Sequence, residues 1–426
     1  MTRTRTDRRR FLTSVMAAGA SAAIFPFPAL SQSNGERVVV IGGGFGGTSC
    51  ARALKRTNPR LSISLIEARP VYTACPMSNA VIAGLRELTL QQFDYEAARR
   101  DGVNLVIGEA QGVDPVAKSV TLRDGARITY DRLVLSPGIE FRKDAPQGYD
   151  AAAAARMPHA WKDGEQIALL RGQLEAMEDG GLVVVSAPVT PARCPPAPYE
   201  RASLIAHHLK TKKPRSKLIV LDAKDTFSMQ RQFQAAWKEL YPDLLEWVPL
   251  SSGGVLTAVE AATNTLVTDF DKYQAAVANV IPPQQAAPIA ELAGVADRTG
   301  WCPVDPVTFE SKLQPHIHVI GDAAIAGAMP KSASAAAAQG KLCAAAIVAL
   351  LAGAKPPAPT VASACYSLVA PDYAISLAGT YRPSADQYLE VEGGVASPPN
   401  APPEQRVREA RGADAWFRTI TQDTYA

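Results

Sequence analysis

The chain has 426 residues, of which 47% are hydrophobic and 20% charged, and its formal net charge is +3. This length is enough for two or three domains with substantial cores, and so small a charge gives no indication of nucleic-acid binding. The six cysteines form no C-x-x-C pair and no C-x-x-C-H motif, which excludes a zinc-ribbon pattern and a haem c attachment site.

Residues 1–31 have the pattern of an export signal. The segment Arg8-Arg9-Arg10-Phe11-Leu12 resembles the twin-arginine signal, and an apolar stretch over 15–25 leads to a small-residue cleavage site at 29–31. The stretch is too short to span a membrane, and no apolar run elsewhere reaches spanning length, so we expect no membrane span. Without these residues, which hold five of the 44 basic and one of the 41 acidic residues, the net charge is about −1. We expect a soluble mature protein in the periplasm.

A dinucleotide-binding motif opens the mature chain. A β-branched strand, 38–41, runs into a turn with Gly42, Gly44 and Gly47 in G-x-G-x-x-G spacing, and a helix is predicted over 48–56. The first glycine permits the sharp turn, the second lets the backbone approach a pyrophosphate, and the third lets helix and strand pack closely. The helix N-terminus then presents free N–H groups to the phosphates.

The next strand strengthens this interpretation. Residues 61–66 form an apolar alternating run that ends at Glu67, close to the spacing of an acid that binds ribose hydroxyls. By itself the glycine motif is weak evidence, and the alternative is a glycine-rich turn that only packs tightly. Short strands follow, with a hairpin predicted around Asp124-Gly125, and the alanine run 151–155 begins a crossing to a second domain.

The second domain repeats the pattern with a different turn. Strands are predicted over 182–185 and 217–222, with a helix over 199–209 between them. The turn 186–196 contains four prolines and no glycine, so it lacks the phosphate cradle of a nicotinamide cofactor. Cys194 lies in this turn just before the helix, where the helix dipole is expected to lower the pKa of a thiol and favour the thiolate.

A strand over 316–320 ends in Gly321-Asp322 and precedes an alanine-rich helix, 332–351. In two-domain flavoproteins an aspartate at this place commonly binds the ribityl chain of FAD; the other interpretation of Asp322 is a helix cap or turn residue. His316 and His318 alternate on the strand without further ligands at matching places, so no metal site is predicted.

Four segments have unusual local sequences: 72–79 (Tyr-Thr-Ala-Cys-Pro-Met-Ser-Asn), 193–201 (Arg-Cys-Pro-Pro-Ala-Pro-Tyr-Glu-Arg), 300–307 (Gly-Trp-Cys-Pro-Val-Asp-Pro-Val) and 365–369 (Cys-Tyr-Ser-Leu-Val). In these segments the chain resembles the flavoprotein subunit of flavocytochrome c sulfide dehydrogenase, a relative of the sulfide:quinone oxidoreductases. The resemblance extends over essentially the whole mature chain.

The resemblance implies a role for several of these residues. Cys75 is expected to attach FAD covalently; the chain has Thr73-Ala74-Cys75 where the family often has Thr-Cys, and the alternative is an unmodified buried thiol. Cys194 and Cys365 are expected to form a redox-active disulfide beside the flavin, the alternative being a structural disulfide. Glu200 is expected to handle the proton of hydrosulfide, or else to cap its helix.

The predicted fold class is α/β, with two Rossmann-like dinucleotide-binding domains of glutathione-reductase type and a small α+β C-terminal interface domain. The boundaries are 1–31 for the signal, 35–150 with 281–356 for the FAD-binding domain, 151–280 for the second domain and 357–426 for the interface domain. The resemblance implies a periplasmic dehydrogenase that oxidises hydrosulfide to sulfane sulfur or polysulfide and passes electrons through FAD to a c-type cytochrome subunit. The alternatives are a sulfide:quinone oxidoreductase and a non-catalytic accessory that reactivates a thiosulfate-oxidising complex.

Overall fold

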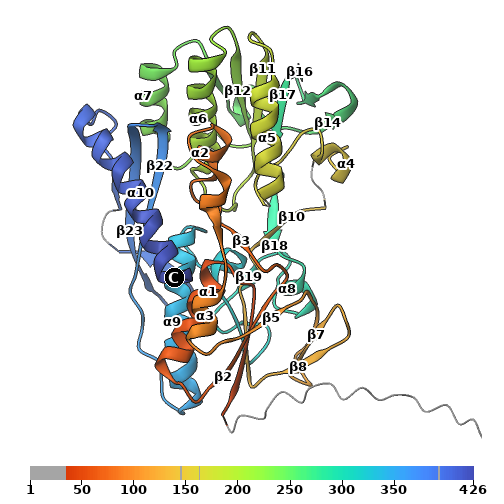
Figure 1. Cartoon of the computed structure of the whole chain (residues 1–426), viewed down its shortest axis with the longest axis vertical. Coiled ribbons are helices and arrows are strands. Elements are labelled where there is room, and N and C mark those ends of the chain that lie inside the picture. The colour runs from red at the N-terminus through yellow and green to blue at the C-terminus, as the bar shows by residue number, and fades with distance from the viewer. Residues whose placement is uncertain (1–34, 144–145, 163, 392–393) are drawn as a thin grey trace, which may run out of the picture. The chain divides into compact units, whose positions relative to one another are not determined.

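The structure is a computed structural model that describes residues 35–143, 146–162, 164–391 and 394–426. The export signal predicted at 1–31 lies outside the described residues. Within the described part, two α/β units are followed by a C-terminal layer of long strands and one helix (Figure 1).

The first unit is built on a five-stranded sheet in which all neighbouring strands are parallel. Its central strand is buried because Val38, Val39 and Val40 are apolar on both faces, as a parallel sheet covered by helices requires. The last strand comes from a distant part of the sequence, so the unit is discontinuous. The order is β20 (Ile317–Val319), β9 (Arg132–Leu135), β1 (Arg37–Ile41), β2 (Ser62–Glu67) and β5 (Asn104–Ile107).

Two helices, α1 (Phe45–Thr57) and α9 (Ala333–Leu351), pack closely against each other in this unit. The close approach depends on glycine, because a Cβ at Gly340 would lie 2.3 Å from the carbonyl oxygen of Gly46. By length and composition alone α9 is able to cross a membrane, but half of its apolar window is buried inside the fold. We interpret α9 as a core helix of the first unit.

The predicted hairpin is confirmed as part of an antiparallel meander, β6 (Ala110–Asp114), β7 (Ser119–Leu122) and β8 (Arg127–Thr129). Its turn uses Gly125 with φ +87°, a left-handed conformation that favours glycine. A two-stranded antiparallel ribbon, β10 (Ile139–Phe141) with β18 (Gln284–Ala286), then pairs the chain leaving the first unit with the chain returning to it.

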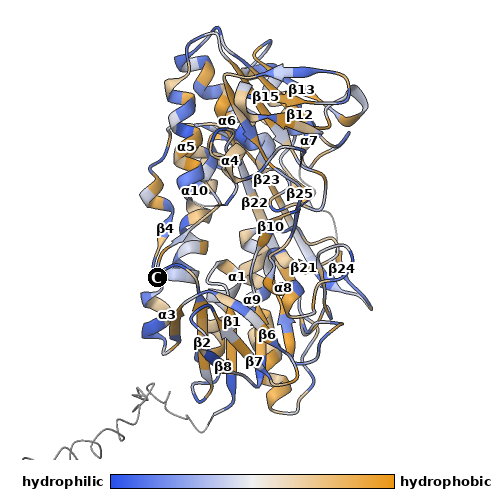
Figure 2. Cartoon of the chain, turned by 90° about the vertical axis from the view of Figure 1, so that its right-hand side faces the viewer, coloured by the Kyte–Doolittle hydropathy of each residue, from blue (hydrophilic) through white to orange (hydrophobic). Residues whose placement is uncertain are grey.

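The second unit has a four-stranded parallel sheet, in which β12 occupies the predicted residues. With the first sheet, it confirms the predicted α/β class with two Rossmann-like units. The strand order is β13 (Leu245–Val248), β12 (Lys217–Asp222), β11 (Leu182–Ala187) and β17 (Val277–Val280), and the helices are α5 (Gly164–Ala176), α6 (Ala197–Lys212) and α7 (Gln230–Leu240). Figure 2 shows apolar residues gathered in the strands of both sheets, for example β1 and β12.

The C-terminal layer is an antiparallel sheet covered by one helix. The strands are β22 (Val361–Ala370), β23 (Tyr373–Pro383), β24 (Tyr388–Glu390) and β25 (Val395–Ala396), and the helix is α10 (Pro403–Tyr425). The end of α10 is held against the first unit by Arg52, whose guanidinium donates to the carbonyl oxygens of Thr424 at 2.9 Å and Ala426 at 2.8 Å. A cation at this place satisfies the free carbonyls of the helix C-terminus.

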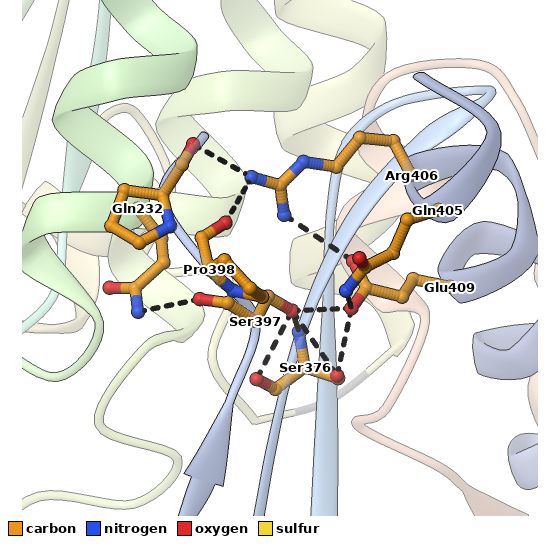
Figure 3. A network of polar contacts seen from close by, with 8 residues as sticks. Gln232, Ser376, Ser397, Pro398, Gln405, Arg406 and Glu409 are labelled. Atoms are coloured by element: carbon orange, nitrogen blue, oxygen red, sulfur yellow. Dashed lines mark hydrogen bonds and ion pairs between the residues drawn. The ribbon is translucent and has the colours of Figure 1, made fainter. Parts of the chain in front are cut away.

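A polar network at the start of α10 joins this layer to the second unit (Figure 3). Arg406 is fully buried and donates to the carbonyl oxygens of Pro398 and Pro399, while its guanidinium also pairs with Glu409 at 3.3 Å. Gln232 of α7 donates to the carbonyl oxygen of Ser397 at 2.9 Å. The network therefore fixes the layer to the second unit through the backbone.

The remaining elements are short: β3 (Tyr72–Thr73), α2 (Ser78–Ile82), η1 (Leu88–Gln91), β4 (Gln92–Phe93), α3 (Glu96–Arg100), α4 (Ala151–Ala154), η2 (Leu250–Ser252), β14 (Ala258–Glu260), η3 (Ala261–Thr263), β15 (Thr265–Val267), β16 (Lys272–Gln274), α8 (Ile289–Leu292), β19 (Cys302–Pro303), η4 (Gly321–Ala323) and β21 (Ala324–Ile325).

Candidate functional site

The turn after β1 has the geometry that a dinucleotide pyrophosphate requires. Gly42 has φ +99°, and a Cβ there would lie 2.2 Å from the carbonyl oxygen of Ser136. A Cβ at Gly47 would lie 1.9 Å from the carbonyl oxygen of Gly42. At Gly44 a Cβ would meet nothing closer than 3.7 Å, in the ring of Tyr72, and the residue lines a large cavity. The packing of the chain explains Gly42 and Gly47, whereas a ligand close to the backbone explains Gly44.

Glu67 is the last residue of β2 and lines the same cavity. Its Oε2 accepts a hydrogen bond from the N–H of Gly43 at 2.6 Å, and its Oε1 accepts one from the N–H of Arg69 at 3.2 Å. The carboxylate thus stabilises the glycine turn and faces the place where a ribose is expected. Its contact with the ribose stays a prediction.

Asp322 lies in η4, between β20 and α9, and also lines the cavity. Burial raises the pKa of this carboxyl, while the charges of Arg193 and Lys331 oppose the increase. The alternative interpretation as the cap of the following helix is wrong, because the hydroxyl of Ser332 caps α9 by accepting from the N–H of Ala335. Asp322 is therefore a buried turn carboxyl at the cavity wall.

The cavity has a volume of about 840 Å³ and is lined by both α/β units and the C-terminal layer. Sites for cofactors and small ligands typically measure roughly 300–1,000 Å³. The glycine cradle, a helix N-terminus, Glu67 and Asp322 fit the phosphates and hydroxyl groups of a dinucleotide. No group of three or more His, Cys, Asp or Glu side chains among the described residues is placed to hold a metal ion.

Cys75 lies between β3 and α2 and lines the same cavity. It is a half-buried free thiol, with Sγ 4.0 Å from the carbonyl oxygen of Trp161. Cys75 therefore lines the same cavity as the glycine cradle, where a flavin thioether would require it. The covalent bond itself stays a prediction.

The structure brings Cys194 and Cys365 to the same cavity from segments far apart in sequence. Cys194 precedes α6 with φ +50°, and its N–H donates to the carbonyl oxygen of Lys331 at 2.8 Å. Cys365 lies in β22, paired with Leu377 of β23. Both are free thiols here, and their electrostatic interaction contributes to the pKa of Cys194. The disulfide between them stays a prediction.

The expectation of a lowered thiol pKa at Cys194 is wrong. Burial raises the pKa of Cys194 well above its ordinary value, Cys365 and Glu200 raise it further, and only Arg193 opposes them. The pKa of Cys365 is also raised by burial, but a hydrogen bond with Ser332 lowers it in part. In the reduced state both groups therefore favour the neutral thiol, because burial disfavours the charged form.

Glu200 is buried in the first turn of α6 and lines the cavity. Its Oε2 accepts a hydrogen bond from Nδ2 of Asn79 at 3.1 Å, and its Oε1 accepts one from the N–H of Leu368 at 3.1 Å. Burial raises the pKa of Glu200 to about 7, although these two hydrogen bonds lower it. A carboxyl with this pKa is suited to general acid–base chemistry near neutral pH. Its partners lie on other elements, so the alternative role as a helix cap is not what the hydrogen bonds show.

Sequence reasoning missed two arginines beside the cysteines, the fully buried Arg201 and the half-buried Arg193. Arg201 is 1% exposed, contacts the face of Trp161 at 5.0 Å and donates to Oδ1 of Asn79 at 3.0 Å and Oδ1 of Asn279 at 3.0 Å. Burial lowers its pKa to about 9. Arg193 hydrogen-bonds the carbonyl oxygen of Trp161 and forms no ion pair among the described residues. Both belong to the 193–201 motif, but only the tertiary contacts show that Arg201 is buried and that both arginines contact Trp161.

In the second unit, the acid in the position equivalent to Glu67 is bonded to side chains of the protein. Asp222 ends β12, where a Rossmann unit that binds a nucleotide has its ribose-binding acid. Its Oδ2 accepts from the hydroxyl of Tyr199 at 2.6 Å and from Nε1 of Trp247 at 3.0 Å, and its Oδ1 pairs with Nζ of Lys224 at 2.6 Å. The ring of Phe227 stacks on Tyr199 at 3.6 Å between centroids. Donors from the chain itself therefore occupy this carboxylate.

Comparisons with protein families agree with this geometry. A pyridine nucleotide-disulphide oxidoreductase model matches residues 36–176, and the model for the central part of the sulfide dehydrogenase [flavocytochrome c] flavoprotein chain matches 167–282. The flavin-binding model of flavocytochrome c sulphide dehydrogenase matches 357–425. A sulfide dehydrogenase [flavocytochrome c] flavoprotein chain from Chlorobaculum thiosulfatiphilum is 50% identical over 46 residues, which are 11% of this chain and 96% of that protein. The chain belongs to the flavocytochrome c sulfide dehydrogenase flavoprotein family.

This family is related to the sulfide:quinone oxidoreductases. The mitochondrial sulfide:quinone oxidoreductase of Mus musculus is 24% identical over 329 residues, 72% of this chain and 69% of that protein. The structure of the sulfide:quinone oxidoreductase from Aquifex aeolicus has the same fold, with a TM-score of 0.72 over 92% of both chains at 18% identity. The flavin-binding match and the glycine cradle together make this family member an FAD-binding oxidoreductase.

Proposed function

We propose that this flavoprotein is a periplasmic, FAD-dependent sulfide dehydrogenase that oxidises hydrosulfide to sulfane sulfur or polysulfide. One observation carries the proposal. The dinucleotide cradle, Cys194, Cys365 and Glu200 line the same cavity, and the pKa of the Glu200 carboxyl is about 7. The family membership and the similarity to sulfide-oxidising proteins support it.

The first unit provides the residues that hold the cofactor. Gly42 and Gly44 line the cavity and, with the N-terminus of α1, would receive the pyrophosphate, while Gly47 lets α1 pack against the turn. Glu67 and Asp322 would bind hydroxyl groups. Cys75 is proposed to anchor the flavin by a thioether. When bound, FAD supplies an acceptor for two electrons beside the cysteines.

The cysteine pair performs the sulfur chemistry. In the oxidised protein, hydrosulfide attacks the Cys194–Cys365 disulfide, so that one cysteine receives the new sulfur as a persulfide and the other leaves as a thiolate. The sulfur of hydrosulfide loses two electrons and the disulfide gains them, so the step needs no further oxidant. Glu200, ionised above about pH 7, accepts the proton of the persulfide.

We propose a c-type cytochrome subunit as the electron acceptor. The sequence has no C-x-x-C-H motif, and the second unit has a proline-rich turn with its acid already paired, which does not favour a nicotinamide partner. The rings of Trp416 and Tyr366 both line the cavity, 6.0 Å apart, and Trp416 belongs to α10, so we propose that electrons leave the cavity through this pair.

An anaerobic titration with sulfide tests the proposal. Sulfide is expected to bleach the flavin of the wild type, and added cytochrome c is then expected to become reduced. In the Cys194→Ser and Cys365→Ser variants, sulfide is expected to bleach the flavin at least 100-fold more slowly. Ser367→Ala is a matched control on β22, because the buried hydroxyl of Ser367 has no hydrogen-bond partner in the described structure. A flavin that ignores sulfide, or cysteine variants that react normally, contradicts the proposal.

The two alternatives are separated by the preferred electron acceptor and by the effect of deleting the gene. A sulfide:quinone oxidoreductase reduces a quinone faster than cytochrome c, and its C-terminus is expected to dock on a membrane, whereas α10 is packed on α1 and β23. If the protein is a non-catalytic accessory, deletion of its gene is expected to slow thiosulfate oxidation and to leave sulfide consumption intact.

A further inference from the structure

A second cavity lies behind the cysteine turn. It has a volume of about 250 Å³ and is lined by the turn after β11 and the segment between β12 and α7. Arg193 and Cys194 are the two residues that line both this cavity and the large one. Of the proposed cysteine pair, Cys194 lines both cavities, and Cys365 lines the large one.

The position of the second cavity is the one where this fold binds ligands. In open parallel α/β sheets, ligands bind in the crevice beyond the carboxyl ends of the strands. Pro188 and Thr190 follow β11, and Lys224 and Ser228 follow β12, so the cavity occupies that crevice of the second unit. With about 250 Å³ it is too small for a dinucleotide, since sites for larger ligands measure roughly 300–1,000 Å³.

The chemistry of the lining favours a small anion. The lining contains two cations, Arg193 and Lys224, three hydroxyl groups and no carboxylate. Arg193 makes no ion pair among the described residues, and its guanidinium hydrogen-bonds the carbonyl oxygen of Trp161, a residue of the large cavity. Nζ of Lys224 donates to the carbonyl oxygen of Pro188 at 2.7 Å and to Asp222 at 2.6 Å, which leaves one of its three N–H groups for a ligand. Pro195 and Phe227 give the cavity apolar walls, which suit a polarisable sulfur atom.

We propose that this cavity is the route by which the sulfur anion, hydrosulfide or the terminal sulfur of a polysulfide, reaches Cys194. The inference rests on the proposed function. A nucleophile attacks a disulfide sulfur in line with the bond that breaks, so attack on Cys194 must come from the side opposite Cys365. The second cavity offers an approach outside the cavity that Cys365 and the cofactor cradle share.

In this step a bond forms between the hydrosulfide sulfur and Sγ of Cys194, and the Cys194–Cys365 bond breaks. Cys365 leaves as the thiolate, and the new persulfide carries the proton until Glu200 accepts it. The environment of Cys365 supports this direction, because Ser332 hydrogen-bonds its sulfur and begins α9, whose N-terminus stabilises negative charge. The thiol with the lower pKa leaves faster, and the hydrogen bond with Ser332 lowers the pKa of Cys365, opposing the effect of burial.

Alkylation of Cys194 tests the route without requiring turnover. The parent is the FAD-loaded Cys365→Ser protein, treated at alkaline pH with neutral iodoacetamide or anionic iodoacetate, and the modified cysteine is located by peptide mass mapping. Ser228→Phe, which fills the second cavity, is expected to slow modification of Cys194 at least tenfold with both reagents. Lys224→Met is expected to slow the modification of Cys194 by iodoacetate severalfold more than its modification by iodoacetamide, because only iodoacetate is an anion. Ser252→Phe, an exposed position on the same unit, is the matched control and is expected to change neither rate.

The outcomes separate this inference from the proposed function. Unchanged alkylation in Ser228→Phe overturns the route, because the reagent then arrives through the cofactor cavity. Absence of modification in the parent also overturns it. With Cys365 present, Ser228→Phe is expected to raise the half-saturating sulfide concentration at least tenfold, while photochemical reduction of the flavin stays normal. A wild-type flavin that ignores sulfide refutes the dehydrogenase function, whereas the alkylation rates still decide the route.

Discussion

The two Rossmann-like units share a strand–turn–helix plan but differ in the turn. After β1 the turn has Gly42, Gly44 and Gly47, and its backbone is free to approach phosphates. After β11 the corresponding turn has four prolines and Cys194, and the acid at the end of the next strand is bonded to three side chains of its own unit. The same scaffold thus presents backbone N–H groups in one unit and a thiol in the other.

This difference shows that the turn, and not the sheet, sets the ligand chemistry of each unit. Glycine removes side chains so that a large anion fits against the backbone. Proline removes N–H groups and stiffens the loop, which suits a turn that holds one thiol in place.

The largest effect is expected from Gly47→Ala. The added Cβ would lie 1.9 Å from the carbonyl oxygen of Gly42, so α1 must shift away from the turn. We expect a loss of more than about 3 kcal/mol in unfolding free energy, at the upper end of overpacking effects, and purification without flavin. Urea unfolding and the flavin absorbance measure both. A stable variant with a full complement of flavin contradicts the role assigned to this turn.

Asp222→Asn tests whether the acid of the second unit has become structural. The substitution leaves Lys224, whose side chain is only 16% exposed, beside an amide in place of a carboxylate. We expect a loss of about 3 kcal/mol in unfolding free energy, because one partner of a buried pair is removed. Asp179→Asn, in an exposed pair with Arg215, is the control and should lie within the small range of surface pairs. Equal stabilities of the two variants would show that Asp222 is not structurally required.

Glu200→Gln is expected to change how stability depends on pH. The carboxyl has its pKa raised from 4.5 to about 7, so its contribution is fully present below pH 4.5 and is lost as pH rises through 7. Between pH 5 and 8 the wild type should therefore lose about 2 kcal/mol more than the variant. Urea unfolding at both pH values measures this difference. It uses no sulfide, so the titration of hydrosulfide does not affect the result. Parallel pH profiles would mean that Glu200 is ionised normally.

The smallest effect is expected from Gly172→Ala. This glycine lies in α5 of the second unit, and a Cβ there would meet no atom within 4 Å. Alanine should stabilise the helix by about 0.5–1 kcal/mol, because it loses less backbone entropy on folding. A thermal unfolding curve suffices to detect the gain. Destabilisation would indicate that Gly172 has a structural role in the second unit.

The sequence by itself determined the features that depend on neighbours along the chain. The glycine spacing after residue 41 predicted the cradle, and the apolar runs predicted β12 with its observed bounds and β11 with close ones. Turn geometry and strand patterning are local, so a few residues are enough to specify them. The resemblance then placed Cys75, Cys194, Cys365 and Glu200, and the structure gathers them around one cavity.

Only the tertiary structure decided the electrostatics of the site. The sequence predicted a lowered pKa at Cys194 from a helix dipole, which is worth about 0.3–1 kcal/mol, less than one pKa unit. Burial shifts a pKa by up to about 3–5 units, and it comes from segments far away in the sequence. The pKa of Glu200 is also set by distant segments, because its hydrogen-bond partners Asn79 and Leu368 are 121 and 168 residues away. These quantities depend on how distant segments pack, and no local pattern of residues encodes that packing.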